Sequence, residues 1–249
     1  MATRRSRRVR YIVLDKTKLG EQDLILTMLS QSGERVSAVA RGARKPGGRL
    51  ASRCDLFCEI DLLLAHGRGL EIVAEASLLD GHVGLRGDLA RVSAASAVCE
   101  VARLTCFEEA EDPYLHPICS RALRACEEAE DQARLDVVVS AYVFKVLAHG
   151  GWKPELSRCV ACGDEDVSHF SAAAGGVLCS SCARNVPGAE EMGRGDLEMV
   201  RALLSSTFDS LLAREVSLRS STMLVGLAHV WAATHLDARL RALEFMLSV

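Results

Sequence analysis

The sequence predicts an α+β protein: a small N-terminal β-barrel, then an all-helical body that carries an inserted ribbon with four cysteines. Three observations predict this class. Short strand-like runs separated by glycine turns come first, apolar residues then recur at helical spacing, and two Cys-x2-Cys pairs interrupt the helical part. We therefore expect one domain at residues 1–83 and a second at 84–249, with the ribbon inserted at 157–185.

Five strand-like runs lie in the first third of the chain. They span residues 9–16, 24–30, 35–41, 54–64 and 70–79. Gly33 stands in the turn after the second run, and residues 42–52 place Pro-Gly-Gly among basic residues, which predicts a mobile loop. Five short strands with glycine turns fit a small closed barrel such as the OB-fold.

The apolar period becomes helical after Gly87. Asp88 is placed to cap the first helix, and Gly150-Gly151 ends the most apolar one. The predicted helices span residues 88–108, 112–126, 133–149, 195–212 and 221–248, the last with a break near His235. Together they form the all-helical body.

Charge is distributed unevenly along the chain. Residues 1–55 carry 13 Lys and Arg against five Asp and Glu, a net charge of +8, whereas the whole chain has −3. The remaining residues therefore carry −11. A basic module joined to an acidic body indicates a polyanion on one side and a protein partner on the other. The size of the surplus favours nucleic acid over a merely solvated basic face.

The expected interface is one face of the barrel on which these cations gather. The candidate DNA-binding residues are Arg7, Arg8, Arg10, Arg35, Arg41, Arg44, Lys45, Arg49 and Arg53, with Arg4 and Arg5 beside them. Only Tyr11 and Phe57 are aromatic in the barrel. Phe57 is assigned to the core, whereas Tyr11 could belong to the core or stack on a base. DNA binding should therefore depend on contacts with phosphates and be independent of base sequence. If roughly five to eight phosphates are neutralised, log K against log salt falls with a slope of about −4 to −6 on a single strand.

Two Cys-x2-Cys pairs predict a metal site. They are Cys159 with Cys162 and Cys179 with Cys182, separated by 16 residues. This is the spacing of a zinc ribbon, and four thiolates complete a tetrahedral shell with no open position, so we expect one structural Zn²⁺. An iron–sulfur cluster can use the same four sulfurs, whereas a redox pair of the thioredoxin kind is disfavoured by the second motif. His169 lies between the pairs and is not needed as a ligand.

The other six cysteines lack metal spacing. They are Cys54, Cys58, Cys99, Cys106, Cys119 and Cys126. Free cysteine behaves as a small apolar side chain, so we assign these to core packing, with Cys54 and Cys58 on one strand face.

Several classes of protein are disfavoured. No run approaches the roughly 18 apolar residues of a membrane span, and the Arg-rich N-terminus is not followed by the apolar segment of a signal peptide, so we expect a cytoplasmic protein. The sequence holds no Walker motif, no Gly-x-Ser-x-Gly and no His-Glu-x2-His. We therefore expect no enzymatic activity.

Several segments resemble one bacterial family. The run Gly20-Glu21-Gln22-Asp23, followed by Gly33-Glu34 and by Ala-Arg-Gly-Ala-Arg-Lys at 40–45, resembles the N-terminal barrel of the RecO family. Gly-Trp-Lys-Pro-Glu-Leu at 151–156 leads into the first cysteine pair in the same way, and residues 235–245 look like the family's C-terminal helix. The resemblance covers essentially the whole chain.

The resemblance implies a mediator of recombination in the RecF pathway of DNA repair. Members of the family have an OB-fold, a helical body and a zinc-finger-like insertion that some members have lost, and the four cysteines place this chain with the zinc-retaining members. They bind single- and double-stranded DNA, anneal complementary strands and, with RecR, help load RecA onto DNA coated by SSB, the single-stranded-DNA-binding protein. The resemblance also implies action at the nucleoid after DNA damage, and a cationic, apolar-lined groove for the SSB tail in the helical body.

Two other functions stay open at this point. A protein–protein adaptor would use the zinc ribbon and the helices without direct DNA binding, and a metal-dependent nuclease would need carboxylates gathered at an open metal site. Salt-dependent retention on DNA separates the adaptor from the mediator, and incubation of labelled DNA with magnesium or manganese reveals a nuclease.

Overall fold

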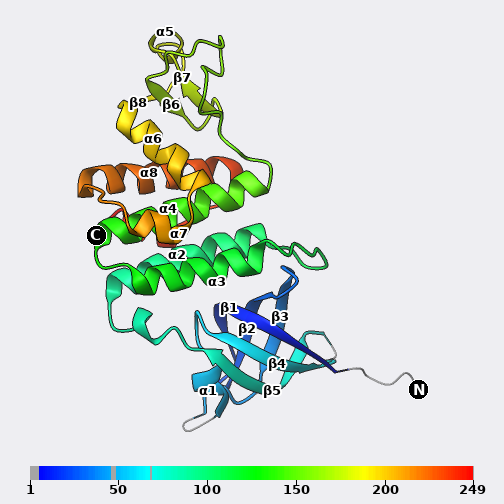
Figure 1. The fold of residues 1–249 in the computed structure, drawn as a ribbon. Helices are drawn as coiled ribbons and strands as arrows, with labels where there is room; N and C mark the ends of the chain where they lie inside the picture. Colours follow the sequence, from blue (N-terminus) through cyan, green and yellow to red (C-terminus); the bar gives the residue numbers. More distant parts are fainter. Residues whose placement is uncertain (1–5, 46–48, 68, 249) are drawn as a thin grey trace. The chain divides into compact units, whose positions relative to one another are not determined.

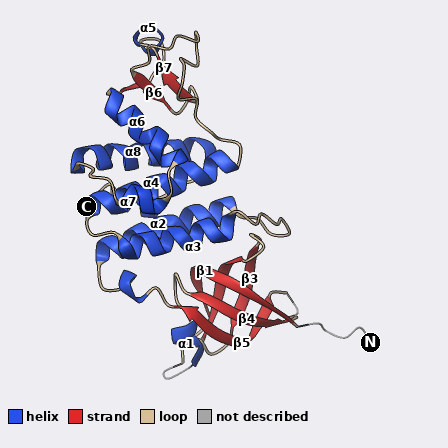
Figure 2. Cartoon of the chain, viewed as in Figure 1, coloured by secondary structure: helices blue, strands red, loops and turns tan. Residues whose placement is uncertain are grey.

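The computed structural model describes residues 6–45, 49–67 and 69–248 (Figure 1). The chain forms two compact units, Met1–Glu127 and Glu128–Val249. The predicted fold class is confirmed, because a closed five-stranded barrel comes first, helices follow, and a small cysteine-containing sheet is inserted among them (Figure 2). The domain boundary predicted between residues 83 and 84 stays a prediction. Across the described residues, no helix combines the length and the apolar character that crossing a membrane requires.

The barrel has the strand order β1-β2-β3-β5-β4. Neighbouring strands are antiparallel except β3 and β5, whose parallel pairing closes the sheet. The strands are β1 (Arg7–Leu19), β2 (Asp23–Ser30), β3 (Arg35–Ala40), β4 (Glu59–Ala65) and β5 (Glu71–Asp80). A closed sheet leaves few unpaired strand edges.

Alternation of side chains fills the inside of the barrel. In β3, Val36, Ala38 and Ala40 are buried while the residues between them are only partly covered. The same period-two pattern places Ile60, Leu62 and Leu64 of β4 in the core. Strand β3 lies within the strand-like run predicted at 35–41.

The predictions for residues 42–58 are wrong in two respects. Residues 42–52 are not one mobile loop, because Arg49–Arg53 form helix α1, while residues 46–48 lie outside the described residues. Strand β4 begins at Glu59 rather than at residue 54. Cys54 and Cys58 therefore precede the strand and do not share a strand face, although both are buried in the barrel core.

Two helices complete the N-terminal unit. They are α2 (Leu89–Thr105) and α3 (Leu115–Glu128), preceded by the short 3-10 helix η1 (Val83–Leu85). Asp88 caps α2 as predicted, since its side chain accepts a hydrogen bond from the backbone N–H of Ala90. Helix α2 packs against β1 and β2. It ends at Thr105, three residues before the predicted end, because Cys106 is extended and Phe107 pairs with Ala110 in a β-bridge.

The link between the two helices lies on the turn between β2 and β3. The backbone N–H of Arg35 donates to the carbonyl of Phe107 at 3.0 Å. A Cβ atom on Gly33 would lie 1.8 Å from the carbonyl oxygen of Asp112, and Gly33 has φ +89°. Glycine is therefore required at this turn for both its conformation and its size. Asp112 accepts from the N–H of Tyr114 before α3 starts at Leu115, three residues beyond the expected position.

A buried histidine joins β5 to α3 within the N-terminal unit. The His82 side chain is fully buried, and its Nδ1 lies 2.7 Å from Glu127 Oε2. Its Nε2 lies 3.5 Å from Glu59 Oε1. The backbone N–H of Gly84 donates to the other carboxylate oxygen of Glu127 at 2.9 Å. These bonds fix the chain where it leaves the barrel.

The C-terminal unit is built around helix α4 (Gln132–His149). It is buried on almost every side and packs against the other long helix of this unit, α8. Its buried Asp136 accepts a hydrogen bond from Ser221 Oγ of α8 at 2.9 Å. The remaining helices are α6 (Arg194–Ser205), α7 (Phe208–Leu212), α8 (Leu218–Leu236) and α9 (Arg241–Met246).

Helix breaks in this unit follow local capping. The predicted helix over 195–212 is two helices, because Thr207 is extended and its side chain caps α7 by accepting from Ser210 N–H. The break predicted near His235 is confirmed, since α8 ends at Leu236 and Asp237 takes a left-handed conformation. The ribbon between α4 and α6 contains β6 (His169–Ser171), β7 (Gly176–Leu178), α5 (Ser180–Ala183) and β8 (Glu190–Glu191), with sheet order β7-β6-β8.

Candidate functional site

The four predicted metal ligands come together in the ribbon. One ligand atom from each of Cys159, Cys162, Cys179 and Cys182 lies within 4.8 Å of all the others. The Sγ atoms of Cys162 and Cys179 are 3.8 Å apart. A tetrahedron with metal–sulfur distances of about 2.3 Å has edges of about 3.8 Å. The arrangement therefore fits a tetrahedral metal ion such as zinc.

Two tight turns present these thiols. In the first, the N–H of Gly163 donates to the carbonyl of Cys159 at 2.8 Å, and Gly163 has φ +81°, which favours glycine. In the second, Cys179 precedes α5, and its Sγ accepts from the N–H of Cys182 at 3.5 Å. A hydrogen bond from the backbone of Cys179 is the main cause that lowers the pKa of Cys159 to about 6. Donors aimed at sulfur favour the thiolate, which is the form that binds metal.

No histidine or carboxylate joins this group among the residues that the structure describes. The Nδ1 of His169 lies 2.9 Å from Ser168 Oγ. Four cysteines thus form the candidate site, in agreement with the expectation from spacing. Four thiolates around one ion leave no position for a substrate, so the site is suited to a structural role.

The other six cysteines are buried, as expected for core packing. All ten cysteines are free thiols. Burial raises the pKa of Cys54 and of Cys106 to about 11 each and that of Cys126 to about 12. Such thiols are protonated at neutral pH and unreactive.

The predicted DNA-binding residues that the structure describes lie in different surroundings. Arg7 contacts Glu71 at 2.8 Å and lies 3.7 Å from Glu34. Arg8 pairs with Glu75 and with Asp61. These arginines lie at the start of β1, so that part of the predicted interface is neutralised by acidic side chains of the barrel itself.

Two more of the predicted cations bond to the protein. Arg35 lies 3.8 Å from Glu108, and its guanidinium donates to the carbonyl of Arg103. The guanidinium of Arg53 donates to the carbonyl of Ala76 at 3.0 Å, which ties α1 to β5. Arg10 is exposed on β1. The side chain of Arg49 and the whole of Arg4 and Arg5 lie outside the described residues.

A second group of cations lies at the other end of the barrel. Lys18, Arg41, Arg44 and Lys45, which we call the loop cluster, are all exposed. Lys18 pairs in register with Leu24, and Leu24 pairs with Ala40, so the end of β1 lies beside the loop that follows β3. Eleven residues of β1 separate Arg7 from Lys18, about 36 Å along the strand. Lys18 was not predicted, because only the strand register places it there.

Backbone hydrogen bonds fix the loop cluster. Asp23 Oδ1 accepts from the N–H of Gly42 at 2.7 Å, and the N–H of Arg44 donates to Gln22 O at 2.9 Å. The guanidinium of Arg44 donates to the carbonyls of Gly20 and Glu21. The runs at 20–23 and 40–45 that resembled a family are therefore one bonded unit.

The two aromatic residues of the barrel are in its core. Tyr11 has 0% and Phe57 3% of its surface exposed. The assignment of Phe57 to the core is confirmed, and Tyr11 belongs there as well. Neither ring is available to stack on a base.

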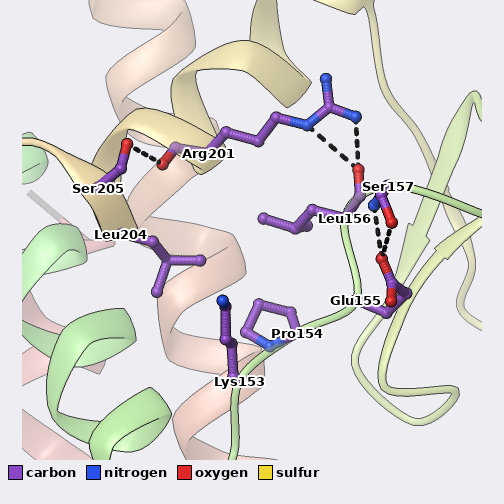
Figure 3. A pocket seen from close by; sticks show the side chains of 8 residues that line it. All are labelled: Lys153, Pro154, Glu155, Leu156, Ser157, Arg201, Leu204 and Ser205. Carbon is purple, nitrogen blue, oxygen red and sulfur yellow. Dashed lines mark hydrogen bonds between the residues drawn. The ribbon is translucent and has the colours of Figure 1, made fainter.

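A pocket of about 530 Å³ opens in the C-terminal unit (Figure 3). The side chains of Leu156 and Lys153 point into it from the linker and that of Leu204 from α6, while Arg201 lies along one side. Arg201 is held in place by a hydrogen bond from its Nε to the carbonyl of Leu156 at 3.2 Å. The pocket thus joins apolar walls to two cations, and its acidic residue, Glu155, already accepts from the N–H of Ser157.

Comparison with known proteins identifies the family. The family model "Recombination protein O N terminal" matches residues 5–82, and "Recombination protein O C terminal" matches residues 86–244. The chain belongs to the RecO family. The expectation drawn from the sequence motifs is thereby confirmed.

Curated relatives agree with this assignment. The chain is 30% identical over 239 residues to the DNA repair protein RecO of Bifidobacterium animalis subsp. lactis, covering 94% of this chain and 96% of that protein. It is 38% identical over 179 residues to the DNA repair protein RecO of a Roseiflexus species, covering 71% of this chain and 62% of that protein. These relatives support a role as a mediator in DNA repair and recombination.

Proposed function

We propose that the chain binds single- and double-stranded DNA without sequence specificity and anneals complementary strands. With RecR, it would help to load RecA onto SSB-coated DNA in the RecF pathway. Family membership supports this proposal, and one observation on the molecule carries it: the loop cluster. Lys18, Arg41 and Lys45 are exposed, and none has a carboxylate partner within the described parts of the chain.

The loop cluster suits a sugar–phosphate backbone. Its cations project from the end of β1 and from a loop fixed by hydrogen bonds, so little ordering of the backbone is needed on binding. Because the rings of Tyr11 and Phe57 are buried, contacts at this end of the barrel are with phosphates and do not read sequence. Four neutralised phosphates give a slope of log K against log salt of about −3 on a single strand, shallower than the charge count predicted.

Anisotropy titration with labelled single strands tests the DNA-binding part of the proposal. Replacing Lys18, Arg41 and Lys45 with Ala should reduce the slope by about 2, since each lost phosphate contact removes about 0.7. The matched control replaces Arg7, Arg8 and Arg35, which already bond to acidic residues, and should change the slope little. A chain whose DNA retention does not depend on salt would instead be the zinc-ribbon adaptor.

The pocket in Figure 3 is the proposed site for the SSB C-terminal tail. A peptide end with carboxylates would meet Lys153 and Arg201, and an apolar side chain would enter between Leu156 and Leu204. Titration of a labelled tail peptide against Lys153→Glu and Leu204→Asp variants tests this assignment. Peptide affinity should fall in both variants, while binding of naked DNA should be unchanged in Leu204→Asp, which alters no proposed DNA contact.

We propose further that the metal is one structural Zn²⁺ and that the chain performs no chemical step. A zinc ion held by four cysteines contributes to folding by cross-linking two turns. Atomic emission of the purified protein identifies the metal, and iron in its place would contradict zinc. A coupled ATPase assay with DNA present should show no turnover, and labelled DNA incubated with magnesium should stay intact. A cytoplasmic location at the bacterial nucleoid accompanies this role.

A further inference from the structure

Two sequence motifs that the proposed DNA site does not use meet in one aromatic stack. Trp152, from the segment after α4, lies flat against His235 near the end of α8, with ring centroids 4.6 Å apart and an angle of 18°. His235 meets Trp231 edge-on at 4.2 Å. Trp231 is buried and contacts Phe144 and Phe170. The stack therefore runs from the core of the C-terminal unit to its surface.

The outer ring of this stack is held in position. The backbone N–H of Trp152 donates to the carbonyl of Leu147 at 2.8 Å, and its own carbonyl accepts from Trp231 Nε1 at 3.2 Å. Gly151 has φ +97°, which lets the chain turn back sharply after α4. His235 lies against one face of the indole, and 49% of the surface of Trp152 is still exposed, so a ligand can reach this residue. A fixed ring loses little conformational entropy when a ligand stacks on it.

The charge around this ring distinguishes it from the other exposed aromatic residues. Phe107 is followed by two glutamates, and Phe245 directly follows Glu244. Trp152 is followed by Lys153, which is exposed and has no carboxylate partner in the described ranges. A flat open ring with an adjacent free cation fits a nucleotide, because a base stacks on the ring and its phosphate meets the ammonium group.

We propose that Trp152, backed by His235, is a stacking platform for an unpaired base of single-stranded DNA, with Lys153 on the neighbouring phosphate. This inference rests on the proposed function in assuming that the chain binds DNA, and it adds a contact that the barrel lacks. A strand bound through phosphates at the loop cluster keeps its bases free for pairing. A strand stacked on Trp152 is held by a contact that salt does not screen.

Intrinsic fluorescence of the full-length, zinc-loaded protein tests the platform, because the chain has only two tryptophans and Trp231 is buried. An oligothymidylate added at about 0.5 M salt, where phosphate contacts are weak, should quench the exposed indole. An abasic strand of equal length should not quench it. Trp152→Leu should weaken oligothymidylate binding by about 5- to 150-fold, the equivalent of one stacked base. Trp152→Phe should retain part of the affinity.

Phe245→Leu is the matched control, because it removes another exposed ring and should leave binding unchanged. Unchanged oligothymidylate affinity in Trp152→Leu would overturn the platform, as would equal quenching by the abasic strand. Quenching by the SSB tail peptide but not by DNA would also overturn it and assign the ring to a peptide. Replacement of Lys18, Arg41 and Lys45 with Ala distinguishes failure of the platform from failure of the proposed function. If the chain binds DNA through the loop cluster, this variant loses DNA binding at low salt whether or not a base stacks on Trp152.

Discussion

The ribbon and the barrel carry candidate sites of opposite kinds. In the ribbon, four ligands come from two short segments, and their spacing brings one ligand atom of each within 4.8 Å of the others. In the barrel, the predicted cations come from several strands and loops, and Arg7, Arg8 and Arg35 contact carboxylates. Spacing specifies a site when its parts are local. Net charge indicates only that a basic surface is present somewhere on the domain. The fold determines which cations are paired with carboxylates and which are not.

Removing the metal should have the largest effect. A structural zinc contributes on the order of 10 kcal/mol to the folding of a small module, and the buried cluster that contains Cys159 and Cys179 has only Leu178 and Ala183 besides them among the described residues. Chelation, or Cys162→Ser, should raise hydrogen exchange throughout 157–185 while DNA binding at the loop cluster persists. Cys106→Ala is the control: it removes a buried thiol, costs about 1–2 kcal/mol and keeps the metal. If chelation left the protection of residues 157–185 from hydrogen exchange unchanged, the metal would not be structural.

The histidine that joins the barrel to α3 ranks second. His82→Ala leaves Glu59 and Glu127 without their partner at a buried position, which costs about 3–5 kcal/mol when one side of such a pair is lost. Urea unfolding measures the loss. His116→Ala on α3 is the control, because burial lowers the pKa of His116 and its Nε2 has no hydrogen-bond partner among the described residues. An equal loss in both variants would mean that packing alone matters here.

The same group predicts how stability depends on pH. The His82 side chain, whose Nε2 lies 3.5 Å from Glu59 Oε1, is the main cause that lowers the pKa of Glu59 from 4.5 to about 2, so this part of the stability is lost as pH falls through that range. Burial acts to lower the pKa of His82, but its contacts with the carboxylates of Glu59 and Glu127 outweigh burial and raise the pKa above 6.5. That contribution is complete below pH 6.5 and is lost as pH rises through the folded-state pKa. Urea midpoints between pH 3 and pH 9 should flatten in His82→Ala.

The fold class and the metal ligands could be predicted from sequence because their signals are local. Alternation of Val36, Ala38 and Ala40 predicts a barrel strand, and cysteine spacing predicts the ribbon. Helix α1 was missed because five residues give too weak a periodic signal against a Pro-Gly-Gly run. The free cations could not be separated from the paired ones, since Arg8 and Glu75 are 67 residues apart and only strand register brings them together.

A smaller effect is expected from the residue that fixes the loop cluster. Asp23→Ala removes the acceptor for the N–H of Gly42, a bond to a charged group worth about 1.5–3 kcal/mol. The variant also removes a negative charge beside the cations. Electrostatics alone predicts tighter DNA binding, whereas loss of loop order predicts weaker binding. We expect weaker binding by anisotropy, with Asp23→Asn restoring part of it, and tighter binding would show that loop geometry is unimportant.

The smallest effect should come from Arg8, and it bears most directly on the comparison. Its side chain is 48% exposed and that of its partner Glu75 is 62% exposed, so the pair contributes about 0–1 kcal/mol. Because Glu75 and Asp61 already neutralise this cation, Arg8→Ala should leave both the urea midpoint and the salt slope of DNA binding nearly unchanged. Glu75→Ala is the reciprocal test, since it removes one of the two carboxylates that contact the guanidinium and should increase DNA affinity slightly. A clear loss of slope in Arg8→Ala would return the start of β1 to the interface and show that these carboxylates release their arginines to phosphate.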